Sequence, residues 1–168
     1  MKLKKIDKTL YRNHLKVVFA GIVLALMVIS IATSTLLIYL FSSPDVSHFL
    51  HNLAGVIVAA ILVFVVLNKF RQHPYMFEVV YVWDLKQALN RINRKLRKIE
   101  AAAENNDNNA MVIMNFMYRG SKQLYELDDN TITMDSLNSK INLLEQRTQE
   151  SGLNVSTSDY DPAMLDQF

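Results

Sequence analysis

Three residues with metal-binding side chains stand at regular spacing between two apolar segments of the sequence. Asp45, His48 and His51 are each three residues apart. Two histidines at i and i+3 share one face of a helix, and imidazole and carboxylate groups are common zinc ligands. Only Ser47 and Asn52 are near enough in sequence to orient such ligands. We therefore name these residues as candidate ligands, but we prefer the interpretation that they are ordinary polar residues, and we expect no metal and no cofactor.

Other groupings typical of enzymes are missing. Serine, histidine and aspartate occur together between Ser42 and Asn52, but 11 residues between two apolar segments cannot position a catalytic triad and an oxyanion hole. The chain has no cysteine, which excludes disulfides, thiolate nucleophiles and cysteine-based zinc sites. Its four glycines lie more than thirty residues apart, which excludes phosphate-binding glycine loops. We predict no catalytic residues and no enzyme.

Four basic residues form the clearest candidate binding surface. Arg91, Arg94, Lys95 and Lys98 follow the spacing i, i+3, i+4 and i+7, which places them on one face of a helix. Such a face can bind anionic lipid head groups, at about 1 kcal/mol per basic group near the membrane. It can also meet the acidic C-terminal tail or another protein, and the plainest alternative is a solvated face without a partner. Nucleic acid is not expected, because no base-reading motif accompanies the charges.

Two apolar segments determine the class of protein. Val17–Phe41 contains 25 residues and Phe49–Leu67 contains 19, and neither segment contains Asp, Glu, Lys or Arg. About 20 apolar helical residues cross the hydrocarbon core of a bilayer, so we predict transmembrane helices over 17–41 and 49–67. The alternatives are buried core helices and, for the first segment, a cleaved signal peptide. The first segment is too long for a signal peptide, whose apolar region has about 7–15 residues.

The basic residues flanking these segments predict the orientation. Residues 1–16 carry six Lys or Arg, the connection Ser42–Asn52 carries none, and residues 68–100 carry eight. By the positive-inside rule both termini are cytoplasmic, with 1–16 as a basic N-terminus and 42–48 as a short outer loop. We expect a multi-pass protein of the bacterial inner membrane. Neither span contains Asp, Glu, Lys or Arg, which disfavours transport, although an oligomeric pore lined by serine and threonine stays open.

Small residues suggest how the two spans pack. Ser30 and Ser34 on the first span fall at depths similar to those of Ala59 and Gly55 on the second. Small residues allow helix backbones to approach closely in lipid. We predict contact between these two small-residue pairs, the alternative being that small residues are simply common in membrane spans.

The remainder of the chain, 68–150, is predicted to be a cytoplasmic helical domain. Pro74 breaks the second span, and an apolar stripe then continues to Ala103, which predicts one long helix. The polar segment 104–109 predicts a turn with Asx capping. Two further striped helices follow over 110–127 and 134–149, and three such helices can form an antiparallel bundle. Residues 151–168 lack a stripe and are predicted to be a mobile acidic tail.

Three stretches carry a resemblance to a known family: Tyr11-Arg-x-His14, His73–Leu96 and Gly120–Thr133. Together they resemble a family of small two-span proteins of gammaproteobacterial inner membranes that is catalogued as a domain of unknown function. The resemblance implies a membrane location and a bacterial origin. It supplies no catalytic residues, and the tail after Gly152 lies outside it.

The functional expectation is therefore an all-α membrane protein in which a transmembrane hairpin precedes a cytoplasmic bundle of about three helices. We interpret it as an interaction or assembly module, with the lipid bilayer and either a second copy or another protein as partners. An oligomeric channel or transport accessory subunit is the first alternative. A transmembrane signalling relay is the second.

Overall fold

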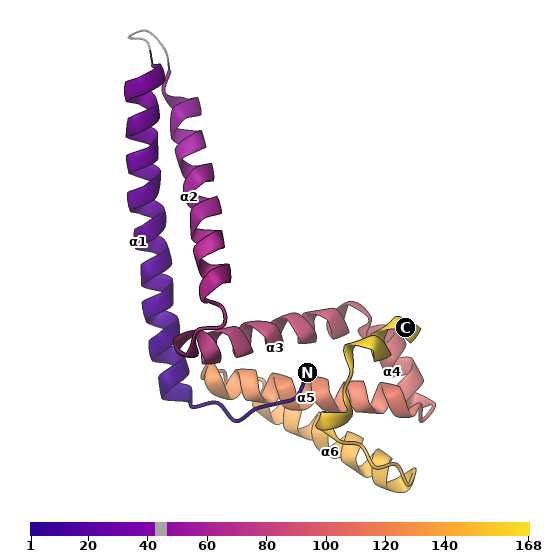
Figure 1. Cartoon of the computed structure of the whole chain (residues 1–168). Coiled ribbons are helices and arrows are strands. Elements are labelled where there is room, and N and C mark those ends of the chain that lie inside the picture. The colour runs from indigo at the N-terminus through magenta and orange to yellow at the C-terminus, as the bar shows by residue number, and fades with distance from the viewer. Residues whose placement is uncertain (43–46) are drawn as a thin grey trace. The chain divides into compact units, whose positions relative to one another are not determined.

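The computed structural model describes residues 1–42 and 47–168, and within them it contains helices and no strand (Figure 1). In chain order the elements are α1 (Lys8–Phe41), α2 (Phe49–Phe70), η1 (Pro74–Met76), α3 (Phe77–Arg94), α4 (Leu96–Glu104), α5 (Asn108–Leu127), α6 (Met134–Glu150), η2 (Thr157–Asp159) and η3 (Pro162–Gln167). The chain divides into two compact units. The hairpin unit is Thr9–Val80, and the helical unit is Met1–Lys8 with Tyr81–Phe168. The predicted all-helical class is confirmed.

The hairpin unit is built on α1 and α2, of 34 and 22 residues. At 1.5 Å per residue they are about 51 Å and about 33 Å long. Both are long and apolar enough to cross a membrane. Large apolar side chains lie on their outer surfaces, with Phe19 65% and Phe64 70% exposed. The first helix begins at Lys8, nine residues before the predicted span, because the polar segment ahead of Val17 continues the same helix.

A short corner follows α2. His73 has an extended backbone (φ −68°, ψ 137°), and Pro74 occupies the first position of η1. The Nδ1 atom of His73 accepts a hydrogen bond from the backbone N–H of Tyr75 at 3.2 Å. This geometry confirms the predicted helix break, since a residue before proline avoids the helical region and proline suits the first helical turn.

The apolar stripe after the corner is divided between two helices. The expected single helix ends at Arg94 and resumes as α4 at Leu96, because Lys95 departs from helical geometry (φ −112°, ψ 7°). Ile92 and Ile99, on either side of the break, are both fully buried. The burial pattern therefore continues across a break that the spacing of apolar residues alone did not predict.

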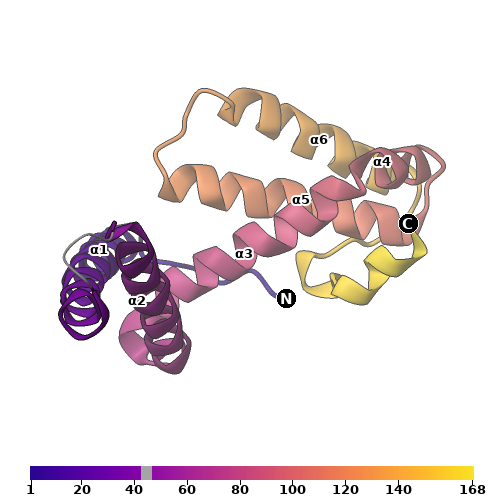
Figure 2. The ribbon, with the colours of Figure 1, turned by 90° about the horizontal axis from the view of Figure 1, so that it is seen from above.

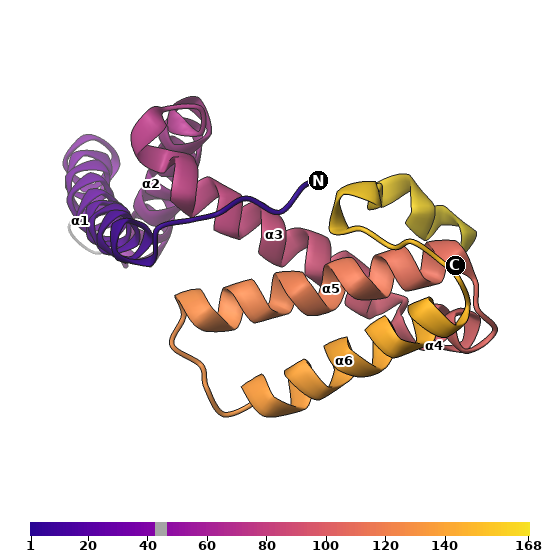
Figure 3. The same cartoon turned by 90° about the horizontal axis from the view of Figure 1, so that it is seen from below.

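The core of the helical unit centres on α5. Residues 110–116 are all buried, and α4, α6 and η2 pack against this helix (Figure 3). The side chain of Asp107 accepts a hydrogen bond from the backbone N–H of Ala110 at 2.7 Å, as expected for Asx capping. The next helix, α6, runs beside α5 in the opposite direction (Figures 2 and 3).

The C-terminal segment differs from the predicted mobile tail. It forms η2 and η3, and a capping box joins Ser156 and Asp159. Tyr160 is buried and stacks on Phe116, with ring centroids 4.1 Å apart and an interplanar angle of 18°. Leu165 is also buried. These two buried side chains help to hold in place a segment that has no helical stripe.

Residues 1–8 also belong to the helical unit. The backbone N–H of Lys4 donates to the hydroxyl of Tyr81 at 2.8 Å, and Gln123 Nε2 donates to the Lys4 carbonyl. The Lys8 ammonium forms an ion pair with Asp129. The start of the chain is therefore fixed to α3 and α5 by specific polar contacts.

Candidate functional site

The candidate metal residues are only partly described. Asp45 lies outside the described residues. His48 and His51 have ring centroids 6.2 Å apart at 67°, and His48 Nδ1 lies 3.0 Å from the Ser42 hydroxyl. Among the described residues no three His, Cys, Asp or Glu side chains are grouped as metal ligands. The prediction for these three residues therefore stays untested.

The small residues of the hairpin unit lie where α1 and α2 approach most closely. A Cβ atom built on Gly55 would lie 2.8 Å from the Ser30 carbonyl oxygen and 3.0 Å from both Cβ and N of Ser34. Ala59 is fully buried. The Ser34 hydroxyl donates a hydrogen bond to the side-chain carbonyl of Asn52. The structure thus brings Gly55 against both serines, rather than against Ser34 alone.

Sequence reasoning missed a polar cluster at the other end of the hairpin unit. His14 Nδ1 lies 3.0 Å from a carboxylate oxygen of Glu78, and both side chains are largely buried, at 15% and 11% exposure. The ring of His14 also lies over that of Tyr75, with centroids 3.9 Å apart. Tyr11, one turn earlier on α1, is buried as well. Two ionisable side chains are therefore held together at the corner between α2 and α3.

The sequence carried one signal for this cluster. His14 and Glu78 are 64 residues apart, so no spacing rule relates them. They do lie in two of the stretches that carried the family resemblance, Tyr11–His14 and His73–Leu96. Only the return of the chain through the hairpin brings these stretches together.

An open groove of about 410 Å³ runs along the same end of the hairpin unit. Its walls are almost entirely apolar and come from α1 (Val18 to Ile29) and α2 (Val63 to Phe70). His73, Tyr75 and Met76 from the corner also line it. Gly21 forms part of the wall, and a Cβ built on it meets nothing within 4 Å.

The predicted basic face occupies the end of α3 and the start of α4. Arg91, Arg94 and Lys98 are exposed. Lys95 differs, because its ammonium donates a hydrogen bond to the Leu165 carbonyl at 2.7 Å. This contact uses a backbone oxygen of the C-terminal segment, so the basic face meets the tail at Lys95.

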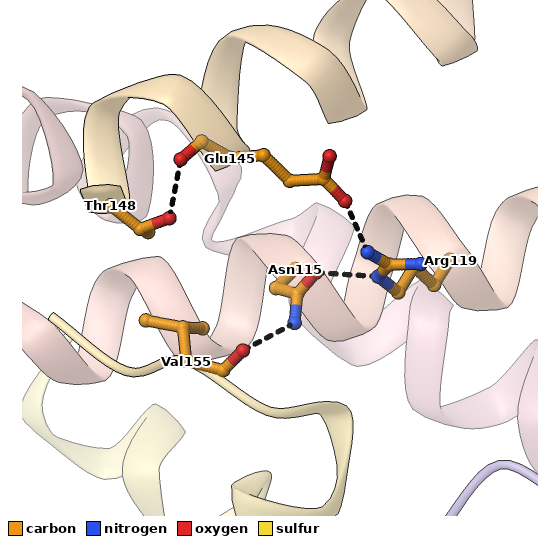
Figure 4. Close-up of polar contacts among 5 residues, drawn as sticks. All are labelled: Asn115, Arg119, Glu145, Thr148 and Val155. Carbon is orange, nitrogen blue, oxygen red and sulfur yellow. Dashed lines mark hydrogen bonds and ion pairs between the residues drawn. The ribbon is translucent and has the colours of Figure 1, made fainter. Parts of the chain in front are cut away.

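A polar network inside the helical unit joins three segments (Figure 4). Asn115, buried on α5, donates to the Val155 carbonyl at 3.4 Å and accepts from Arg119 Nε at 2.9 Å. The Arg119 guanidinium also pairs with Glu145 on α6. A buried amide is stable only when it is hydrogen-bonded. The network therefore fixes α6 and the C-terminal segment relative to α5.

Two adjoining hollows form a trough on the helical unit, each of about 360 Å³. They share Tyr118 and Lys140, and they extend between α6 and the α3 and α4 segments over α5. Leu143 is 60% exposed on the rim of the trough, and Leu137 and Met117 contribute apolar surface. The walls combine apolar side chains with charges of both signs.

Three tyrosines of the helical unit have a raised pKa. For Tyr81, Tyr118 and Tyr160, burial is the main cause, since it disfavours the phenolate. The charge of Arg91 opposes the rise in the pKa of Tyr160. The Tyr160 hydroxyl is buried without a hydrogen-bond partner among the described residues. A raised pKa suits structural tyrosines that stay neutral at physiological pH.

Comparison with known proteins identifies a family. The model of this family matches residues 1–165, and its description is "Protein of unknown function (DUF3087)". The match includes residues 153–165 of the C-terminal segment. The resemblance seen in the sequence did not cover these residues. No curated protein and no solved structure matches the chain.

Proposed function

The chain belongs to the family described as protein of unknown function (DUF3087), and we propose that it is an inner-membrane interaction or assembly module. In this proposal α1 and α2 cross the bilayer as a hairpin, and the helical unit lies in the cytoplasm, where it binds a second copy or another protein. The observation that carries the proposal is that Met1–Lys8 and Tyr81–Phe168 form one compact unit, although the hairpin separates them in sequence.

This make-up supports the topology. One folded unit lies on one side of a membrane, so residues 1–8 and 81–168 share a compartment. The chain between them must then cross the membrane an even number of times, and two apolar helices satisfy that condition. The excess of Lys and Arg beside the helical unit favours the cytoplasm as the shared compartment.

The trough supports binding of a protein partner. It offers exposed Leu143 together with Lys140 and Arg147, so an amphipathic helix fits its chemistry.

A pore receives less support from the same structure. The serines suggested for a pore lining contribute instead to the contact between α1 and α2, since both lie against Gly55. Ser34 is also hydrogen-bonded to Asn52 within the hairpin unit.

A signalling relay is the second candidate, and one feature favours it. Helix α3 begins in the hairpin unit and continues without a break into the helical unit. A continuous helix is a stiff connection through which a displacement of the spans can reach the helical unit. A relay predicts that changing His48 alters the solvent accessibility of Trp83, the only tryptophan.

Reporter fusions test the topology. Reporters that are active only in the cytoplasm or only in the periplasm are fused after residue 168 and inserted after Ser47. We expect cytoplasmic activity at the C-terminus and periplasmic activity at Ser47. A periplasmic C-terminus, or full solubility of the intact chain without detergent, refutes the proposal.

Crosslinking in native membranes tests the partner. Crosslinked peptides are identified by mass spectrometry for the parent chain, for Leu143→Asp in the trough, and for Asn142→Asp as the control. Asn142 is exposed and lies next to Leu143 but outside the trough, so Asn142→Asp introduces the same charge without changing the trough. We expect Leu143→Asp to lower the main crosslink about tenfold, equivalent to about 1.4 kcal/mol, and the control to retain it. Equal crosslinking of both variants refutes docking at the trough, and conductance of the purified protein in liposomes without any crosslink favours the channel.

A further inference from the structure

We propose that one exposed side of α3 binds the anionic lipid head groups of the membrane surface. This surface, the α3 face, consists of Trp83, Gln87, Arg91 and Arg94. The inference rests on the proposed membrane insertion of α1 and α2. It gives the basic residues of the helical unit a partner of their own, separate from the partner that the trough would bind.

Helical spacing and burial place the α3 face on the side of the helix that is turned away from the core. Its residues stand at i, i+4, i+8 and i+11, which share one side of a helix, and all four are exposed. Leu85 and Leu89 occupy the opposite side. A Cβ atom built on Gly120 of α5 would lie 3.2 Å from Leu85 Cδ1 and 3.3 Å from Leu89 Cδ2. The α3 face therefore points away from α5.

The charge of this part of the chain is entirely positive. Residues 85–99 contain six Lys or Arg and no Asp or Glu. Lys86 pairs with Asp128, and Lys95 donates to the Leu165 carbonyl. The remaining four are exposed and form no ion pair within the described residues: Arg91, Arg94, Arg97 and Lys98. Their charge is complementary to an anionic surface.

The acidic C-terminal segment is a poor candidate for that surface. Asp159 accepts a hydrogen bond from the backbone N–H of Ser156, and Asp161 accepts one from that of Ala163. Both carboxylates therefore cap the short helices of their own segment. The contact with Lys95 uses a backbone oxygen instead of a carboxylate. The segment thus leaves the α3 face exposed.

Trp83 favours a lipid surface over an acidic protein or a nucleic acid. Its side chain is large and apolar, yet the residue is 59% exposed. Tryptophan is enriched at membrane interfaces, where the ring lies among the head groups and its N–H stays hydrated. Helix α3 begins seven residues after α2 ends, and Trp83 is about 9 Å further along its axis. This short connection keeps Trp83 near the membrane surface from which α2 emerges.

Fluorescence of Trp83 tests the inference in the full chain, because Trp83 is the only tryptophan. The chain is reconstituted into vesicles of phosphatidylcholine alone or of phosphatidylcholine mixed with phosphatidylglycerol. The acyl chains of both leaflets carry bromine, which quenches tryptophan, so the direction of insertion does not affect the result. We expect quenching and a shift to shorter wavelength only with phosphatidylglycerol. Salt at about 1 M, where the screening length is about 3 Å, should reverse both effects.

Two charge-matched variants test which basic residues are responsible. Arg91→Gln with Arg94→Gln should lower the ratio of lipid-bound to unbound α3 face about thirtyfold, equivalent to about 2 kcal/mol for two basic groups. The control is Lys122→Gln with Lys140→Gln, which removes the same charge from α5 and α6. We expect the control to be quenched like the parent chain.

Three results overturn the inference: equal quenching in the two kinds of vesicle, unchanged quenching in the arginine variant, or an equal loss of quenching in the control. Protection of Trp83 in native membranes but not in the vesicles would also overturn it and would make an acidic protein the partner. A chain that stays in solution without detergent or lipid would refute the membrane proposal. An inserted chain whose Trp83 stays unquenched refutes this inference alone, so the two failures are distinguishable.

Discussion

Replacing Gly55 by alanine should weaken the hairpin unit, although alanine is the better helix former. The added Cβ would lie 2.8 Å from the Ser30 carbonyl oxygen and 3.0 Å from the Ser34 nitrogen. Both are backbone atoms that no rotamer change can move, so α1 and α2 must separate. Such overpacking costs about 1–3 kcal/mol. Loss of the Ser34–Asn52 hydrogen bond adds about 0.6 kcal/mol, and the helix propensity of alanine returns up to about 1 kcal/mol. The net expectation is a loss of about 0.6–2.6 kcal/mol, rising to about 3 kcal/mol for Gly55→Leu.

Gly21→Ala is the matched control for this change. It is the same substitution on the partner helix, but its Cβ meets nothing within 4 Å. We expect no loss of stability and a gain of up to about 1 kcal/mol. The two alanine variants should therefore differ by about 2 kcal/mol, even though their sequence changes are chemically identical.

Unfolding in mixed micelles measures this difference. The chain has no cysteine, so single cysteines at exposed Leu36 and Val58 can carry a donor and an acceptor dye. The fluorescence transfer between the helices is followed as the fraction of sodium dodecyl sulfate increases. Equal midpoints for Gly55→Ala and Gly21→Ala would refute the close contact at Gly55. A stabilised Gly55→Ala would refute it more strongly.

Other predictions concern the corner and the helical unit. Tyr160→Ala should lower the free energy of unfolding by about 3 kcal/mol, because it removes a buried ring that stacks on Phe116. Tyr160→Phe should be neutral or stabilising, because the buried hydroxyl has no partner among the described residues. Thermal unfolding followed by circular dichroism measures both variants, and a destabilising Tyr160→Phe would contradict the prediction. The stability losses of His14→Ala and Glu78→Gln should not add, and a double-mutant cycle should give a coupling energy of about 0.5–3 kcal/mol. Additive losses would show that the 3.0 Å contact between the two side chains contributes nothing to stability. Burial raises the pKa of three tyrosines, including Tyr81 and Tyr160, above the usual value of 10.0, so the neutral form is favoured in the folded state. The resulting stability is complete below pH 10 and is lost as the pH rises through the raised pKa values; an ultraviolet titration in which every tyrosine ionises together near pH 10, with unchanged stability, would exclude it.

Much of the secondary structure could be predicted because it depends on local patterns. The apolar stripes and the Asx cap at Asp107 fixed the extents of α5 and α6 to within two residues. Pro74 marked the corner for a local steric reason. The break at Lys95 was not predictable in this way, because the apolar spacing continues across it.

The contacts that form the candidate sites depend on residues far apart in the chain. The His14–Glu78 pair forms only after the chain has turned back through the hairpin. The buried position of Tyr160 depends on an aromatic surface of α5 that comes 44 residues earlier at Phe116. A segment whose apolar residues follow no helical stripe resembles a mobile tail until that surface is present. By contrast, the small-residue pattern at Ser34 and Gly55 was readable, since close helix approach in lipid restricts residue size directly.

The attachment of residues 1–8 to α3 and α5 determines how this protein can be divided for experiments. A fragment that starts at Phe77 would lack the Lys4 backbone groups that bond to Tyr81 and Gln123, and Asp129 would lose the ammonium of Lys8. A version without the hairpin should instead replace Thr9–Val80 with a short flexible linker that keeps both parts of the helical unit on one chain. In domain terms the hairpin unit is an insertion near the N-terminus of the helical unit, so a single cut of the chain cannot separate the hairpin from an intact helical unit.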